Sequence, residues 1–187
     1  VLCVLCFLAS QAFADDGLTS RDNVVADYPF DGNASDTSGN GRDGTVHGKP
    51  SFATGKVGQG IVLDGEHDFV DCGPWPKELT GEFTIQCWVK PAARQNTCAD
   101  LFGNHFHGAL GIALEQDGGN TNQFAAHYGA EGGRWVSTRP VRLVADRWQH
   151  VAVVKTAEEL QLFVNGILLG SVRDSAPVAA SPRPFRI

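Results

Sequence analysis

Apolar and polar residues alternate most regularly over residues 82–90. In an extended chain, alternate residues share a face. The apolar residues on one face are Phe83, Ile85, Cys87 and Val89. Thr84 and Gln86 lie between them, and Pro91 follows the run. The pattern predicts a β-strand that packs against a core with one face and ends at the proline.

A second pattern lies in two apolar runs, which cover residues 148–154 and 160–170. The first run carries apolar residues on both faces, which is typical of a strand in the middle of a sheet. The second contains Asn165-Gly166, a pair favoured in two-residue type I′ turns. We therefore expect a central strand followed by a β-hairpin.

Further short runs recur along the chain, separated by breaks that contain Gly, Pro or Asn. They cover residues 24–30, 60–63, 68–71, 99–102, 110–114, 122–128 and 134–138. Pro29 confines the first of them to a sheet edge or to the end of the strand. About a dozen short strands, without a long amphipathic helix pattern, predict an all-β fold in which two antiparallel sheets form a sandwich.

Length and charge narrow the range of functions. A chain of 187 residues favours a single domain. Its net charge of −6 argues against a nucleic-acid-binding protein, because such proteins need a basic surface. The same charge removes the simplest attraction to anionic membranes, so we expect neither a nucleic-acid partner nor membrane insertion of the mature domain.

Residues 1–14 have the features of a secretory signal peptide. Their apolar run is too short to span a bilayer, and a small-x-small cleavage pattern ends at Ala14. We expect cleavage after Ala14 and an extracellular or periplasmic domain over residues 15–187; the alternative is a buried N-terminal strand. The signal lacks its positive start, and residues 184–187 resemble the opening of another strand, so we expect further sequence and further domains at both ends.

Four motifs follow one another in a characteristic order. They are Tyr28-Pro-Phe-Asp-Gly-Asn33 with the loop after it, Gly58-Gln-Gly-Ile-Val-Leu-Asp-Gly65, Phe83-Thr-Ile-Gln-Cys-Trp-Val-Lys-Pro91, and the stretch from Trp148 to Asn165-Gly166. Together they resemble LamG-like jelly-roll domains, members of the concanavalin A-like lectin/glucanase superfamily. The resemblance covers residues 24–187 and implies a jelly roll whose closing strand follows Ile187. Without that strand a sheet edge stays unpaired, so we expect the chain alone to be poorly stable or to aggregate.

The loop after the first motif is rich in the oxygen donors that calcium prefers. These residues are Asp31, Asn33, Asp36, Ser38, Asn40 and Asp43. An EF-hand is excluded because its twelfth position would be His47 rather than Glu. The family resemblance implies a structural Ca²⁺ near this loop; the alternative is that these side chains only form turns.

Three cysteines remain after the predicted cleavage: Cys72, Cys87 and Cys98. Export permits disulfides. Because Cys87 lies within a predicted strand, where a thiol behaves as a small apolar group, Cys72 with Cys98 is the preferred pair. The alternative is that all three thiols stay reduced.

Histidines supply a second candidate metal site. His105 and His107 alternate, so both imidazoles could face one side, with Asp100 or His127 as a third ligand for zinc or copper. The spacing fixes no third ligand, and solvated or hydrogen-bonded histidines are the alternative.

Tryptophans are candidates for stacking against sugar rings. Trp75 and Trp135 lie in Gly- and Pro-rich surroundings, with Arg134 beside the latter, and are the surface candidates. Trp88 and Trp148 lie within apolar strands, where core packing is expected. Packing is also the alternative role for the first pair.

Catalytic patterns are weak in this chain. Glycoside hydrolases of the superfamily place carboxylates in a Glu-x-Asp-x-x-Glu string on one strand. Here the nearest string starts at Glu115 but ends in Asn120 and contains Gly118-Gly119, which predicts a turn. We therefore assign no catalytic residue. The sequence favours a secreted, non-catalytic module that binds a glycan or an extracellular protein; the alternatives are a fragment of a glycan-active enzyme and a purely structural surface domain.

Overall fold

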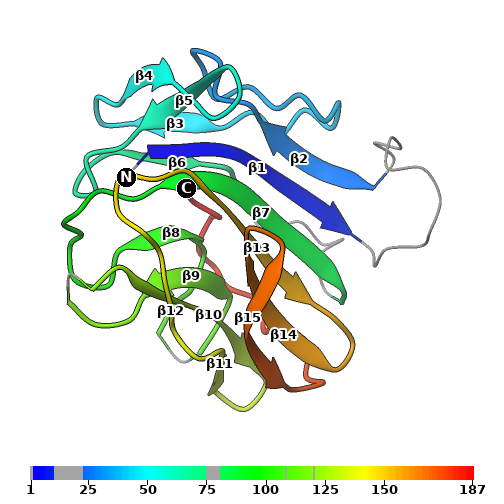
Figure 1. Ribbon diagram of the computed structural model, residues 1–187. Coiled ribbons are helices and arrows are strands. Elements are labelled where there is room, and N and C mark those ends of the chain that lie inside the picture. Colours follow the sequence, from blue (N-terminus) through cyan, green and yellow to red (C-terminus); the bar gives the residue numbers. More distant parts are fainter. Residues whose placement is uncertain (1, 11–22, 75–80, 108, 120) are drawn as a thin grey trace.

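The computed structural model describes residues 2–10, 23–74, 81–107, 109–119 and 121–187, and every regular element in them is a β-strand. All strand pairs are antiparallel. The strands form two layers around one core (Figure 1). The all-β antiparallel sandwich predicted from the short apolar runs is thus confirmed.

The larger layer is a sheet of eight strands in the order β15-β14-β13-β7-β1-β5-β4, with β2 paired to β1. Its strands are β1 (Leu2–Ser10), β2 (Val24–Tyr28), β4 (Ser51–Thr54), β5 (Gln59–Val62), β7 (Phe83–Lys90), β13 (Gln149–Lys155), β14 (Glu159–Val164) and β15 (Ile167–Arg173). As predicted, β13 is central, because β7 and β14 pair with its two sides. We call this layer the first sheet.

The second layer has the order β11-β10-β9-β8, with β12 beside β10. Its strands are β8 (Asp100–Gly103), β9 (Ile112–Gln116), β10 (Gln123–Ala130), β11 (Arg134–Ser137) and β12 (Val141–Arg142). A separate pair joins β3 (Thr45–His47) to β6 (Phe69–Asp71). We call the β8 to β12 layer the second sheet.

The last three residues link β6 to β8. The N–H of Val70 donates to the carbonyl of Ile187 at 2.8 Å, and the N–H of Ile187 donates back at 3.0 Å. On the other side, Gly103 and Arg186 exchange hydrogen bonds of 2.9 and 2.8 Å. Residues 185–187 thereby extend the second layer from β8 across to β6 and β3.

The two sheets bury their facing side chains in one hydrophobic core. The alternation predicted for β7 is confirmed, since the four apolar residues of its inner face are at most 1% exposed and the residues between them are half-buried. From the opposite sheet the core receives Ile112, Leu114, Phe124, Ala126 and Tyr128. This alternation decides which side chains of the second sheet face outward.

Trp88 is not a core residue, contrary to the prediction. It is half-buried on the outer side of β7. Its ring centroid lies 5.3 Å from the ring centroid of His150, and the Nζ of Lys56 lies 5.0 Å from the Trp88 centroid. Trp148, just before β13, is also only half-buried. The apolar run around each tryptophan predicted burial, but it does not show on which face of the strand the indole lies.

The Asn165-Gly166 turn has the predicted geometry. The φ angles are 51° at Asn165 and 78° at Gly166, and a type I′ turn needs positive values at both positions. Val164 and Ile167 pair directly across the turn. The predicted hairpin is therefore confirmed as β14 and β15.

Leu2–Ser10 forms β1, which lies within the segment predicted to be a signal peptide. β1 pairs with β7 on one side and with β2 and β5 on the other. This is the alternative weighed above, an N-terminal strand, while cleavage after Ala14 stays a prediction. None of the described residues forms a helix long and apolar enough to cross a membrane.

Candidate functional site

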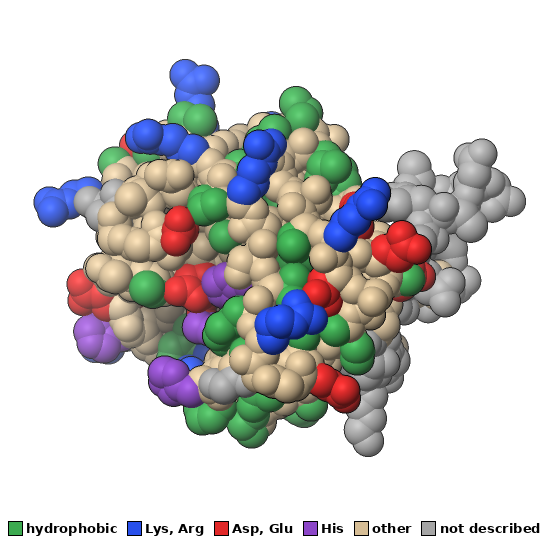
Figure 2. Space-filling view, turned by 90° about the horizontal axis from the view of Figure 1, so that it is seen from below, with side chains coloured by type: hydrophobic (Ala, Val, Ile, Leu, Met, Phe, Trp, Pro, Cys, Tyr) green, Lys and Arg blue, Asp and Glu red, His purple; other side chains and the backbone are tan. Residues whose placement is uncertain are grey.

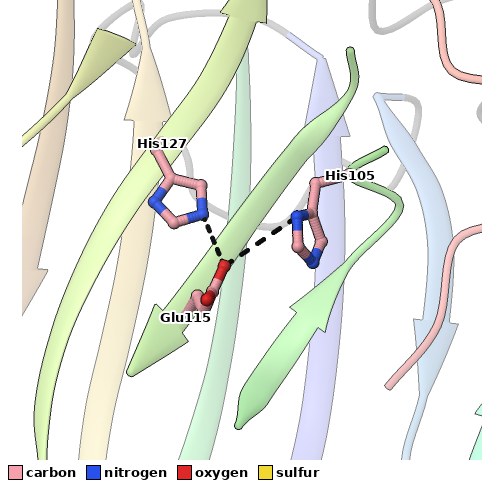
Figure 3. Close-up of side chains that lie close together, drawn as sticks. All are labelled: His105, Glu115 and His127. Carbon is pink, nitrogen blue, oxygen red and sulfur yellow. Dashed lines mark hydrogen bonds and ion pairs between the residues drawn. The ribbon is translucent and has the colours of Figure 1, made fainter. Parts of the chain in front are cut away.

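Ionisable side chains gather on the outer face of the second sheet (Figures 2 and 3). Glu115 on β9 and His127 on β10 each follow a core residue, so strand alternation turns both away from the core. In the register of the sheet, Glu115 lies opposite Ala125 and His127 opposite Ala113. The two polar side chains are therefore diagonal neighbours, and the small alanines leave room for them to meet.

The loop between β8 and β9 brings His105 to the same place. The preceding residue, Asn104, is buried, and its Oδ1 accepts a hydrogen bond of 3.0 Å from the N–H of Ile112. The carbonyl of Asn104 accepts another, of 2.5 Å, from the hydroxyl of Ser181. These contacts fix the start of the loop and the position from which His105 projects.

A close backbone approach fixes the end of this loop. The N–H of Gly129 on β10 donates to the carbonyl of Gly111 at 2.8 Å, and its carbonyl accepts from Ala179 at 2.7 Å. A Cβ atom at Gly129 would lie 1.7 Å from the carbonyl oxygen of Ala109. Only glycine allows the loop to lie this close to the strand.

Two hydrogen bonds and one longer ion-pair contact join the four ionisable groups into one cluster. The Nε2 of His105 donates to Asp100 Oδ2 at 3.0 Å, and the Nε2 of His127 donates to Glu115 Oε2 at 3.1 Å. The Nδ1 of His105 lies 3.8 Å from the same Glu115 oxygen (Figure 3). Glu115 thus lies between two imidazoles that come from different parts of the fold. We call Asp100, His105, Glu115 and His127 the His–Glu cluster.

The pKa values of the two imidazoles shift in opposite directions. The hydrogen bond to Asp100 raises the pKa of His105, which favours its charged form. Burial lowers the pKa of His127, which favours its neutral form. Nearby, a hydrogen bond to Glu115 raises the pKa of the Cys98 thiol, so this cysteine stays protonated at neutral pH.

An exposed indole borders the cluster. The Trp135 ring centroid lies 5.5 Å from that of His127 and 6.2 Å from that of His105, and the residue is 43% exposed. Asp100 and His105 line a hollow of about 240 Å³. Glu115 and His127 line another, of about 350 Å³. The face therefore combines an open aromatic ring, charged hydrogen-bonding groups and shallow depressions.

The first sheet offers a competing surface. A mainly apolar hollow of about 400 Å³ lies over β7, β13 and β14. Gln86, His150, Gln161 and Phe163 are among the residues that line it. Its lining contains two carboxylate or ammonium groups, Glu82 and Lys155, and Phe163 is half-buried there.

Residues 64–187 match a laminin G-type family model described as the concanavalin A-like lectin/glucanases superfamily. The chain belongs to this superfamily. The resemblance drawn from the four motifs is thereby confirmed. No curated protein matches the sequence of this chain.

Solved structures of the superfamily fold are similar to the whole chain. Domain 4 of AbnA, a GH43 extracellular arabinanase from Geobacillus stearothermophilus in complex with arabinotriose, aligns with a TM-score of 0.68 and 20% identity over 100% of this chain and 84% of that one. The binding domain of botulinum neurotoxin DC in complex with SialylT aligns with a TM-score of 0.63 and 11% identity, over 99% of this chain and 43% of that one. The binding domain of Paraclostridial mosquitocidal protein 1 aligns with a TM-score of 0.60 and 15% identity, over 99% of this chain and 47% of that one. At these identities the likeness concerns the fold.

Of the three residues predicted to bind a ligand, one lies beside the His–Glu cluster. This residue is Trp135. Arg134 instead pairs with Asp174, with its Nη1 2.5 Å from Oδ2, and Asp174 also accepts a hydrogen bond of 2.8 Å from the hydroxyl of Tyr128. Trp75 lies outside the described residues. Ligand binding by Trp75, Arg134 and Trp135 stays a prediction.

The predicted calcium residues make hydrogen bonds within their own loop. The carboxylate of Asp36 accepts from the N–H groups of Asp27, Ser38 and Arg42 and from the Ser38 hydroxyl, at 2.8 to 3.0 Å. The side chains of Asn33 and Asp43 accept from Ser35 and Asp36, that of Asp31 accepts from Gln59, and that of Asn40 donates to Val24. These contacts favour the turn role, and Ca²⁺ binding stays a prediction.

Cys72, Cys87 and Cys98 form no disulfide with one another. Cys72 is half-buried against the core, Cys87 is buried in β7, and Cys98 is exposed. The pairing of Cys72 with Cys98 therefore stays a prediction that the structure does not display.

The predicted histidine site has different members. His105 and His127 come together with Asp100, but His107 is exposed and packs on Phe106, with ring centroids 5.8 Å apart. Glu115 was missed because the predicted strand ended at residue 114, which put it in a turn. β9 continues to Gln116 and turns Glu115 outward. The alternation over residues 112–116 was the signal that could have found it.

Proposed function

We propose that this chain is a secreted, non-catalytic module that recognises carbohydrate on the outer face of its second sheet. The observation that carries the proposal is the exposed Trp135 ring beside the His–Glu cluster, whose members line two open hollows. A flat indole covers the apolar face of a sugar ring, while imidazole and carboxylate groups bind its hydroxyls. The open shape suits a chain that is gripped along its length more than a small molecule enclosed in a deep pocket.

The comparisons support a carbohydrate ligand. In the solved structures, the arabinanase domain is in complex with arabinotriose and the neurotoxin binding domain is in complex with SialylT. Two different ligands on one fold are consistent with recognition that depends on variable side chains over a common scaffold. The arabinanase that contains the first domain is described as extracellular, which agrees with the predicted secretion.

A binding role fits the state of the carboxylates better than hydrolysis does. Glycoside hydrolases need two carboxyl groups that flank the scissile bond, about 5 to 10 Å apart. In the cluster, Asp100 and Glu115 are each hydrogen-bonded to a histidine, and the Asp117 of the predicted string lies beyond the end of β9. A glycan-active enzyme remains the second candidate, favoured by this pair of carboxylates on one face.

Glycan binding tests the proposal directly. The full chain is applied to an array that includes arabino-oligosaccharides and sialylated glycans, and bound ligands are then incubated with it to detect cleavage. Trp135→Ala should weaken binding about tenfold or more, the loss typical of a central aromatic contact. The matched control is Trp88→Ala, an indole on the outer face of the first sheet.

Three outcomes decide between the candidates. Loss of binding in Trp135→Ala but not in Trp88→Ala supports the proposed face. The reverse result would place recognition on the first sheet and overturn the assignment of the site. Cleavage of a bound glycan by the chain would overturn the non-catalytic role.

A further inference from the structure

We propose that the His–Glu cluster binds a divalent cation of the zinc class through His105, Glu115 and His127. This inference goes beyond carbohydrate recognition and does not depend on it. The ligand atoms of these three residues all lie within 4.8 Å of one another. Two imidazoles and one carboxylate form a donor set that zinc accepts, with a fourth position left for water.

The separations fit a tetrahedral ion. With metal–ligand bonds of about 2.0 to 2.1 Å, tetrahedral geometry places neighbouring ligand atoms roughly 3.3 Å apart. Glu115 Oε2 lies 3.1 Å from His127 Nε2 and 3.8 Å from His105 Nδ1. The ligand nitrogens of the two histidines lie within 4.8 Å of each other, so the imidazole side chains must rotate toward a common centre to reach coordination distance.

Asp100 holds His105 in the orientation that coordination requires. It accepts a hydrogen bond from Nε2, so when the ring gives up one proton the other stays on Nε2, and Nδ1, which faces Glu115 (Figure 3), can bind an ion. A carboxylate behind a ligating imidazole is the usual partner in protein zinc sites, where it fixes the tautomer. Asp100 is thus a positioning residue, and the ligand that it orients is on the adjacent loop.

The scaffold positions the three ligands before any ion arrives. Glu115 and His127 project from paired strands, whose register sets their spacing. His105 follows the buried Asn104, and Gly129 lets the loop lie against β10. The side chains of His105, Glu115 and His127 are 31%, 16% and 17% exposed, so an ion from solvent can reach them. A site held by rigid elements loses little entropy when it is filled.

Metal titration of the full chain, without any sugar, tests this inference. Zn²⁺ is titrated calorimetrically into chelator-treated protein, and Co²⁺ binding is followed by visible absorption, whose intensity reports tetrahedral coordination. We expect one Zn²⁺ per chain and a melting temperature that rises with Zn²⁺ concentration. Ca²⁺ should not compete, because calcium prefers a larger set of oxygen ligands.

Variants identify the ligands. Glu115→Gln keeps the shape of the side chain, and His127→Ala removes one imidazole; both should abolish the Co²⁺ band and weaken Zn²⁺ binding by roughly 100-fold or more, beyond the loss expected from a supporting residue. The matched control is His107→Ala, two residues from His105 and outside the cluster, which should bind as the parent does.

A separate variant tests the role of Asp100. Asp100→Asn should weaken Zn²⁺ binding about 10- to 100-fold and shift the Co²⁺ band, while the melting temperature of the metal-free protein stays that of the parent. A parent chain that binds neither Zn²⁺ nor Co²⁺ would overturn the inference, as would binding that Glu115→Gln and His127→Ala leave intact. Either result leaves the glycan measurements untouched, so the two proposals can fail independently.

Discussion

Asp64 organises the loop that borders the smaller hollow of the site. Its Oδ1 accepts hydrogen bonds from the N–H groups of Glu66, His67 and Asp68, at 2.8 to 2.9 Å. Glu66 and Asp68 line the same hollow as Asp100 and His105. These three bonds lower the pKa of Asp64 to about 2, since they favour the charged carboxylate.

The depressed pKa makes the stability of the protein sensitive to acid. The folded pKa lies below the ordinary value, so Asp64 contributes stability above about pH 3.8 that is lost as the pH falls to about 2. Asp64→Asn keeps an acceptor oxygen but removes the charge. We expect its deficit in the free energy of unfolding, measured with urea, to shrink over this range. The exposed Glu158→Gln is the control, and a deficit for Asp64→Asn that is independent of pH would contradict the prediction.

At the scale of elements, the sequence predicted the strands with strong apolar patterns, interpreted Leu2–Ser10 as a signal peptide, and missed several short strands. Phe83–Lys90 and the hairpin after Asn165 have strong alternation or a specific turn pair, and both are confirmed. Thr45–His47, Ser51–Thr54 and Val141–Arg142 were not predicted, because they are short and mostly exposed, so no apolar periodicity marks them.

Only part of the candidate site was predicted, for a similar reason. Local spacing can show that His105 and His107 alternate, but not that a loop carries only the first of them to β9 and β10. The partner Glu115 depends on the end of a strand, and strand ends are the hardest feature to predict from one sequence. Contacts between distant segments are set by sheet register and loop packing, which leave little local signal.

The position of the loop between β8 and β9 depends on Gly129, which lies on β10. In Gly129→Ala, the new Cβ would meet the backbone of Ala109, so the strand or the loop must move. We expect a loss of about 3 kcal/mol or more in the free energy of unfolding, at the upper end for overpacking. The displaced loop should also move His105 away from Glu115. Chemical denaturation and the histidine proton resonances measure the two effects.

Gly119→Ala provides the comparison, because the nearest atom to its new Cβ, the hydroxyl oxygen of Thr97, is 3.6 Å away. This substitution should change stability by less than about 1 kcal/mol. Equal effects of the two substitutions would show that the close approach at Gly129 does not hold the loop.

At the scale of the whole molecule, β1 joins the two parts of the first sheet. On one side lie β7, β13, β14 and β15; on the other lie β2, β5 and β4. The predicted cleavage after Ala14 would remove this strand and leave the facing edges of β7 and β5 unpaired. The sheet would then present two open edges in its middle, the kind of feature that promotes aggregation.

A chain that starts at residue 15 should show this gap. At about 1 kcal/mol net for each hydrogen bond, the loss of a strand paired on both sides removes several kcal/mol of stability. Hydrogen exchange should become fast for the amides of β7 that face β1, while those that face β13 stay protected. The amides of β9 and β10 serve as the internal reference. Unchanged protection and an unchanged, cooperative melt would contradict the prediction.

The place of residues 185–187 also has a consequence for the order in which the protein is made. β6 and β8 leave the ribosome more than eighty residues before the segment that joins them, as their positions in the chain show. Until that segment emerges, Val70 and Gly103 have no backbone partner on these sides. The second layer therefore cannot close before residues 185–187 are synthesised, and until then a nascent chain carries two temporary edges that chaperones or neighbouring chains can reach.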